Sequence, residues 1–119
     1  MRIISGDFGG RTLKTVEGPG YRPATAKVRG AIFSMLESRG VHWPETSVLD
    51  LFAGSGSLGF EAMSRGASLA WFVEKGKGPA QCLRENAKAL GLGPDRCRIL
   101  AADLFSVLKK GPDASGGPR

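Results

Sequence analysis

A threefold alternation of short apolar stretches with helical patterns is the feature that most limits how this chain can fold. The expected strands lie at residues 48–52, 69–74 and 97–102, and the expected helices lie at residues 58–65, 79–90 and 104–108. This alternation is typical of a parallel sheet whose strands are joined by right-handed helical crossovers. We therefore predict an α/β fold with a parallel sheet of about three strands.

The residues before this alternation have a different pattern. Residues 2–5 and 11–16 alternate apolar and polar side chains around a glycine-rich turn, which predicts a β-hairpin. Thr25 is expected to cap a helix that has one apolar face and that ends at Gly40. The predicted organisation is a hairpin and helix with a basic arm over residues 1–46, the sheet over residues 47–110, and a flexible tail over residues 111–119.

Charge and composition indicate the kind of partner. The 119 residues have a formal net charge of +6, and the first 30 carry six basic and two acidic side chains. Such an arm suits a polyanion, for example RNA, and a solvated basic surface is the alternative. Two cysteines and one histidine provide neither a disulfide framework nor a metal-binding cluster. With no apolar run of the ~18 residues that a membrane span needs, and no signal peptide, we expect a cytoplasmic protein.

A glycine-rich loop follows the first expected strand. Gly54, Gly56 and Gly59 have the spacing G-x-G-x-x-G, which allows backbone N–H groups to approach a bound nucleotide. Glu74 ends the next strand, twenty residues beyond Gly54, where a carboxylate can accept hydrogen bonds from the hydroxyls of a ribose. A tight turn beside an unrelated acidic residue is the alternative interpretation.

Two aspartates narrow the choice of ligand. Asp50, just before the loop, would repel the pyrophosphate of a dinucleotide, whereas it suits S-adenosylmethionine, which carries an ammonium and a sulfonium group. Asp103, after the third strand, is placed to accept a hydrogen bond from the adenine amino group, and it can also cap the helix that follows. S-adenosylmethionine is therefore the expected cofactor. An NAD-type oxidoreductase domain is the less favoured alternative.

The loop and its surroundings resemble a known family. The segments Asp50–Leu51–Phe52–Ala53–Gly54–Ser55–Gly56 and Leu58–Gly59–x–Glu61–Ala62–x–Ser64–Arg65–Gly66–Ala67 are similar to those of bacterial small-subunit ribosomal RNA guanine-N2 methyltransferases. The likeness includes Arg22–Pro23–x–Thr25–x–x–x–Arg29 and Phe72–Val73–Glu74, and it covers about residues 2–108.

This resemblance implies a Rossmann-like methyltransferase sheet, S-adenosylmethionine as cofactor, and a guanine amino group of ribosomal RNA, free or in the assembling small subunit, as substrate. It implies cofactor contacts from Asp50, Phe52, Gly54, Ser55, Gly56, Glu74, Asp103 and Leu104. It implies RNA contacts from Arg11, Arg22, Thr25 and Arg29.

The sequence departs from the family pattern at two places. Gly30 stands where the family usually has Glu. The family's catalytic segment, Asp/Asn-Pro-Pro-Tyr/Phe at the end of a fourth strand, has no counterpart, because no two of the seven prolines are adjacent. We therefore assign no catalytic residue and expect this chain alone to transfer no methyl group. A non-catalytic RNA- or nucleotide-binding fragment is the alternative.

A sheet truncated after about three strands leaves an open edge. In the resembling family the first strand, here residues 48–52, lies in the middle of the sheet. Without a neighbour on its other side, its backbone N–H and C=O groups would be unpaired. We therefore expect the chain alone either to be marginally stable or to self-associate through this edge.

Overall fold

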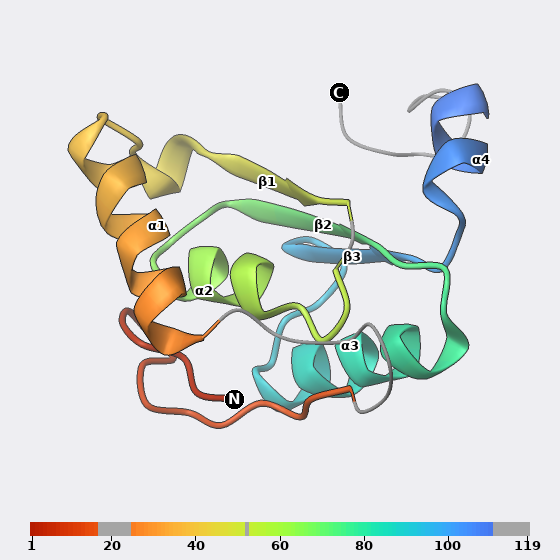
Figure 1. Cartoon of the computed structure of the whole chain (residues 1–119), viewed down its shortest axis with the longest axis horizontal. Helices are drawn as coiled ribbons and strands as arrows, with labels where there is room; N and C mark the ends of the chain where they lie inside the picture. Colours follow the sequence, from red (N-terminus) through yellow and green to blue (C-terminus); the bar gives the residue numbers. More distant parts are fainter. Residues whose placement is uncertain (17–24, 52, 111–119) are drawn as a thin grey trace.

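A computed structural model describes residues 1–16, 25–51 and 53–110 (Figure 1). In chain order the elements are α1 (Ala26–Ser38), the short 3-10 helix η1 (Trp43–Glu45), β1 (Ser47–Asp50), α2 (Ser57–Ser64), β2 (Leu69–Val73), α3 (Lys77–Ala89), β3 (Cys97–Leu100) and α4 (Leu104–Lys110). Each strand and helix expected between residues 48 and 108 is present. The tail expected over residues 111–119 lies outside the described residues.

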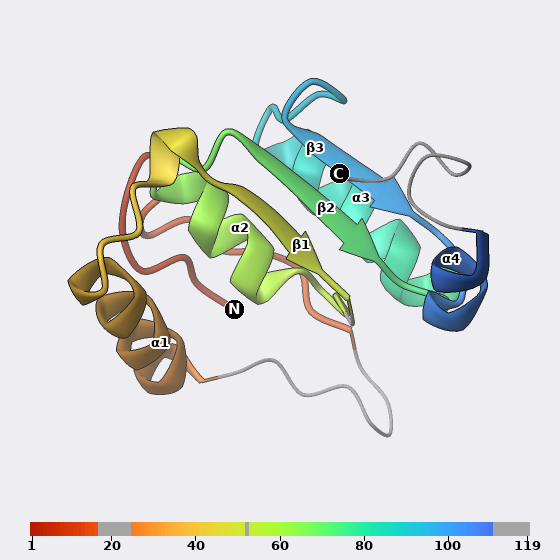
Figure 2. The same cartoon turned by 90° about the horizontal axis from the view of Figure 1, so that it is seen from above.

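The three strands form one parallel sheet in the order β1-β2-β3. Phe72 on the central strand pairs with Asp50 of β1 and with Ile99 of β3. Helices α2 and α3 lie on one face of this sheet, and α4 lies beyond the carboxyl ends of the strands (Figures 1 and 2). The predicted α/β class is confirmed. Within the described ranges β1 has a hydrogen-bonded neighbour on one side only, so it is an edge strand.

Both ends of α1 follow from its sequence. The Oγ1 atom of Thr25 accepts a hydrogen bond from the backbone N–H of Val28 at 3.2 Å, which pairs one of the donors that a helix leaves free at its start. Gly40, just after the helix, has φ +92°, a left-handed conformation that residues with a Cβ rarely adopt. The expected cap and the expected end of this helix are confirmed.

The N-terminal strap, by which we mean residues 1–16, runs along α2 and α3 on the side away from the sheet (Figure 1). Arg2 and Thr12 form an isolated antiparallel bridge, the N–H of Ile3 donates to the carbonyl of Arg11 at 3.0 Å, and the N–H of Gly10 donates to the carbonyl of Ile3 at 2.7 Å. The expected hairpin is thus present as one bridge around a turn, not as two strands. Other backbone N–H groups of the strap donate to side chains of α2 and α3, so the β-ladder does not extend beyond this one bridge.

One buried cluster joins the strap and α1 to the sheet. Ile3, Phe33, Phe60 and Phe72 all belong to it, and the ring centroids of the last two lie 4.7 Å apart. A Cβ atom on Gly59 would lie 2.2 Å from Cε1 of Phe72, so α2 can approach β2 this closely only with glycine there. Trp43 and Trp71 are buried as well. The predicted division at residue 46 therefore runs through a shared core.

Candidate functional site

The candidate site lies at the carboxyl edge of the sheet. The glycine loop follows β1, Glu74 follows β2, and Asp103 comes shortly after β3. Because the strands are parallel, their carboxyl ends share one edge, which is where open α/β sheets bind ligands. The topology therefore brings to one edge three segments that are separated in the sequence.

The glycine loop owes its shape to two left-handed glycines. Gly54 has φ +55° and Gly56 has φ +85°, and the N–H of Gly56 donates to the carbonyl of Ala53 at 2.8 Å. A Cβ atom on Gly56 would also lie 2.5 Å from Cε2 of Phe60, so a side chain is excluded there by space as well as by conformation. Ser55, between the two glycines, is buried. The loop is thus a tight turn packed on the start of α2.

Glu74 connects the end of β2 to this loop. Its Oε1 atom accepts a hydrogen bond from the N–H of Gly54 at 3.0 Å, and its Oε2 atom accepts one from the N–H of Gly76 at 2.9 Å. The residue is only 7% exposed. The interval of twenty residues that suggested a shared site therefore corresponds to direct contact between Glu74 and Gly54.

The two aspartates occupy different surroundings. Asp50 is the last residue of β1 and is half-buried at the start of the loop. Asp103 is exposed, and its Oδ1 atom accepts a hydrogen bond from the N–H of Phe105 at 2.7 Å, so it caps α4 as the sequence allowed. Leu104 is the first residue of α4. Phe52, also expected at the site, lies outside the described residues.

The described residues among those expected to contact RNA have different surroundings. Arg11 is exposed on the strap, where its Nη2 atom donates to the carbonyl of Ala89 on α3 at 2.5 Å and its guanidinium lies 6.0 Å from the ring centre of Phe8. Thr25 is exposed, but its hydroxyl is used in capping α1. Arg22 lies outside the described residues.

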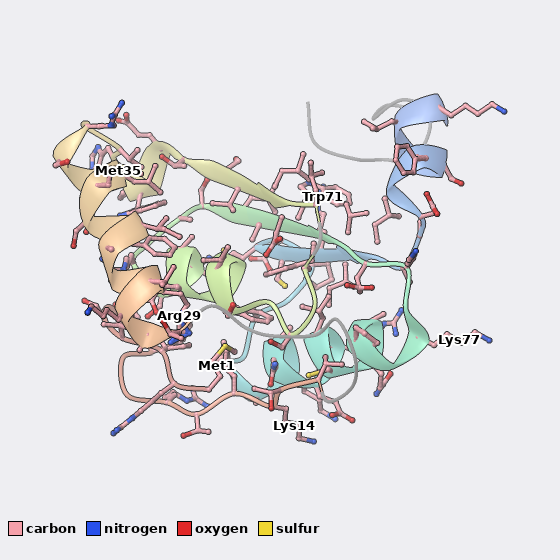
Figure 3. All side chains as sticks on the ribbon, in the orientation of Figure 1. Met1, Lys14, Arg29, Met35, Trp71 and Lys77 are labelled. Carbon is pink, nitrogen blue, oxygen red and sulfur yellow. The ribbon has the colours of Figure 1, made fainter. Side chains whose placement is uncertain are left out.

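The expectation for Arg29 is corrected by the structure. This residue is 2% exposed on the inner side of α1 (Figure 3), and its Nη2 atom donates to the carbonyl of Arg2 at 2.7 Å. An RNA phosphate cannot reach a guanidinium that is enclosed in this way. Arg29 ties α1 to the strap. The resemblance implied an RNA contact from its place in the motif, whereas its burial depends on how α1 packs on the strap.

Three buried polar residues that hold the strap were not assigned a role from the sequence. Glu61 accepts hydrogen bonds from the N–H groups of Ile4 (2.9 Å) and Ser5 (3.2 Å). Ser64 accepts one from the N–H of Phe8 at 2.9 Å. Asn86 accepts one from the N–H of Lys14 at 2.8 Å. All three side chains are almost completely inaccessible to solvent. These roles could have been predicted from the sequence, because a polar side chain among the apolar positions of a helix indicates a buried group that needs a hydrogen-bond partner.

Metal and membrane sites have no support in the part of the chain that the structure describes. There, no group of three His, Cys, Asp or Glu side chains could hold a metal ion, and no helix is both long and apolar enough to cross a membrane. Burial raises the pKa of the Cys97 thiol to about 11, so this thiol stays protonated at neutral pH and is a poor nucleophile. The loop and Glu74 therefore remain the candidate site.

Comparison with known proteins identifies the family. The family model described as Conserved hypothetical protein 95 matches residues 1–116. The ribosomal RNA small subunit methyltransferase D of Escherichia coli (strain K12) is 38% identical over 108 residues, which are 91% of this chain and 52% of that protein. The chain thus spans about half the length of this relative.

Solved structures agree with this family and with the fold. A hypothetical protein of Thermus thermophilus superimposes with a TM-score of 0.78 at 35% identity, covering 98% of this chain and 63% of that one. The tRNA (m1A58) methyltransferase TrmI from Aquifex aeolicus shares the fold alone, with a TM-score of 0.60 at 20% identity over 80% of this chain and 34% of its own. The sheet is therefore of the Rossmann-like methyltransferase type, and the resemblance noted in the sequence is confirmed. The chain belongs to the family described as Conserved hypothetical protein 95, alongside proteins named as methyltransferases of small-subunit ribosomal RNA.

Proposed function

We propose that the carboxyl edge of the sheet binds S-adenosylmethionine and that the chain is the cofactor-binding part of a ribosomal RNA methyltransferase. The observation that carries this proposal is the contact between the Glu74 carboxylate and the Gly54 amide of the glycine loop. An ionised carboxylate has about four acceptor positions, of which the amides of Gly54 and Gly76 use two. No other described residue donates a hydrogen bond to this carboxylate, and we assign its remaining positions to the ribose hydroxyls of the cofactor.

The other residues of the site fit the same ligand. The carboxylate of Asp50, beside the loop, favours a cationic ligand and disfavours a pyrophosphate, which separates S-adenosylmethionine from NAD. Asp103 keeps acceptor capacity after capping α4, so we assign it to the adenine amino group, with Phe52, Ser55, Gly56 and Leu104 completing the cofactor contacts. When bound, the cofactor supplies an electrophilic methyl group. Titration with S-adenosylhomocysteine and with NAD tests the assignment.

We propose a guanine amino group of small-subunit ribosomal RNA as the substrate, and the cytoplasm as the place of action. The relative from Escherichia coli is named for methylation of this RNA. We assign to RNA phosphates Arg11 on the strap and Arg22, which lies outside the described residues, now that Arg29 is excluded. Thr25 stays a proposal for RNA contact from its exposed position at the start of α1.

Charge reversal on this arm is expected to weaken RNA binding. Replacing Arg11 and Arg22 by Glu removes phosphate contacts whose strength comes from the release of counterions. We expect each substitution to lower the affinity for small-subunit ribosomal RNA fragments about tenfold and to reduce the slope of log K against log[salt] by about 1. Fluorescence anisotropy at several salt concentrations measures both quantities.

The matched control is Arg98→Glu, which makes the same change of charge. Arg98 is exposed and stacks at 5.4 Å on Trp71, whose side chain lies on the other side of the sheet from the strap (Figure 3). This variant is expected to keep the affinity of the unmodified protein. Equal losses in Arg98→Glu and in the arm variants would mean that only net charge matters and would refute the assignment.

We infer that this chain alone transfers no methyl group. Methylation of an exocyclic amine requires acceptors for its N–H groups and a means of holding the base. The 119 residues do not contain the Asp/Asn-Pro-Pro-Tyr/Phe segment to which the resemblance assigns these roles. Binding of RNA or of a nucleotide without catalysis is the alternative function, and it would leave the cofactor unconverted in the presence of RNA.

We also propose that two copies of the chain associate through the edge strand β1. Leu49 and Leu51 on and after β1 are 47% and 37% exposed, and the strand contains no lysine or proline that would protect its edge. A mostly apolar hollow of about 210 Å³ adjoins the strand, between α1 and α2. A second copy that pairs with β1 would cover both the outer backbone edge of the strand and these side chains.

Sedimentation velocity between low and high micromolar concentration is expected to show dimers or larger species. Leu49→Lys places a charge on the exposed face of the edge strand and is expected to shift the protein toward the monomer. A monomer at high micromolar concentration of the unmodified chain would show that β1 does not pair with a second copy.

A further inference from the structure

Asn86 on α3 makes an unusual set of contacts for a buried side chain. It is 2% exposed, and its amide group is hydrogen-bonded to two segments that are distant in the sequence. Its Oδ1 atom accepts from the N–H of Lys14 at 2.8 Å, and its Nδ2 atom donates to the carbonyl of Lys14 at 3.0 Å. The same Nδ2 atom donates to the carbonyl of Ser55 at 3.1 Å. Asn86 therefore bonds the strap in the manner of a β-strand while it also holds the glycine loop.

The other two polar anchors of the strap differ in this respect. Glu61 and Ser64 bond the strap at Ile4, Ser5 and Phe8. Within the described residues, no side-chain hydrogen bond of Glu61 or Ser64 reaches the glycine loop. The Nδ2 group of Asn86, in contrast, donates to the strap at the Lys14 carbonyl and to the loop at the Ser55 carbonyl. Asn86 is thus the anchor through which a change in the strap can reach the loop.

We propose that Asn86 is a positioning residue that couples the N-terminal strap to the glycine loop. This inference deepens the proposed function and rests on it, since the loop is where S-adenosylmethionine is proposed to bind. A docked strap fixes the Ser55 carbonyl and with it the tight turn beside the proposed ligand site. Coupling of this kind is reciprocal, so a ligand that orders the loop favours the docked strap, which carries Arg11. RNA and cofactor would then strengthen each other's binding.

The substitution Asn86→Asp separates coupling from packing. It preserves the size of the side chain and the acceptor for the Lys14 N–H, but it replaces the Nδ2 group, and with it both donors, by one oxygen atom that faces the carbonyls of Lys14 and Ser55. Ser64→Ala is the matched control, because it removes the two hydrogen bonds that the Ser64 hydroxyl makes to the strap, at Phe8 and Ser5, without touching a partner of Asn86.

Amide hydrogen exchange without any ligand is the test. In Asn86→Asp we expect exchange at residues 12–16 and also at residues 54–57 to accelerate roughly 2- to 10-fold, the factor that one intramolecular hydrogen bond contributes. In Ser64→Ala we expect acceleration near residues 5–8 and unchanged exchange in the loop. The affinity for S-adenosylhomocysteine should fall by a similar factor in Asn86→Asp only.

A second variant perturbs the coupling from the strap side. Lys14→Pro removes the backbone N–H that donates to Oδ1 of Asn86, while the side-chain amide of Asn86 stays in place. This variant therefore also tests the coupling if Asn86→Asp does not fold. Unchanged loop exchange in a folded Asn86→Asp or Lys14→Pro protein would overturn the proposal. Because exchange is measured without ligand, failure of the unmodified protein to bind S-adenosylhomocysteine would refute the proposed function and leave this result interpretable.

Discussion

Glu74→Ala is expected to bind S-adenosylhomocysteine about 30- to 150-fold more weakly than the unmodified chain. The substitution removes a carboxylate that accepts from the amides of Gly54 and Gly76 and that is proposed to accept from the ribose. Charge-assisted hydrogen bonds of this kind contribute roughly 2–3 kcal/mol, which corresponds to that change in affinity. Titration calorimetry measures it directly.

Two variants make the result specific. Asp95→Ala removes a carboxylate that is exposed just before β3, at the opposite end of this strand from the candidate site; this variant is expected to leave cofactor affinity unchanged. Glu74→Gln keeps one acceptor oxygen but loses the charge, so its cofactor affinity is expected to lie between that of Glu74→Ala and that of the unmodified chain. If Glu74→Ala bound as well as the unmodified protein, the carboxylate would have no part in the site.

Glu61→Ala is expected to cost about 3–5 kcal/mol of unfolding free energy, the usual effect of removing one member of a buried ion pair. Glu61 is fully buried, accepts from the N–H groups of Ile4 and Ser5, and lies 3.0 Å from Nε of Arg65. Its removal leaves three donors without their acceptor. Since typical domains are stable by about 5–15 kcal/mol, a large part of the stability would be lost. Urea unfolding followed by circular dichroism measures the change.

The control for this prediction is an acidic residue at the surface. Glu45 is exposed on η1, with Oε2 3.8 Å from Nδ1 of His42. Because exposed pairs of this kind contribute little, Glu45→Ala should change the unfolding free energy by less than about 0.5 kcal/mol. A loss below about 1 kcal/mol in Glu61→Ala would contradict the view that this carboxylate fastens the strap to α2.

The elements and the position of the site could be predicted from the sequence because their signals are local. The cap at Thr25, the glycine spacing after β1 and the acid at the end of β2 each depend on a few neighbouring residues and on the parallel topology. The strap could not be predicted in the same way. Its hydrogen bonds join residues that are far apart in the chain, such as Lys14 and Asn86, which are separated by 72 positions.

Arg29 illustrates the limit of reasoning from a family motif. Its place in the segment from Arg22 to Arg29 implied an RNA contact, and arginines are mostly exposed. Burial followed instead from the packing of α1 against the strap, where the carbonyl of Arg2 accepts its Nη2 donor. For Glu74 the spacing predicts a ribose acceptor, which stays a prediction, and its bonds to two backbone amides became visible only in the folded chain.

The most direct test of the cofactor assignment is the ligand preference of the unmodified chain, measured by titration calorimetry with S-adenosylhomocysteine and with NAD under the same conditions. Asp50 beside the glycine loop should reject a pyrophosphate, while Glu74 accepts the ribose that both ligands contain. We expect S-adenosylhomocysteine to bind at least about tenfold more tightly, a difference of about 1.4 kcal/mol. Tighter binding of NAD would contradict the assignment and would point to a dinucleotide site on the same loop.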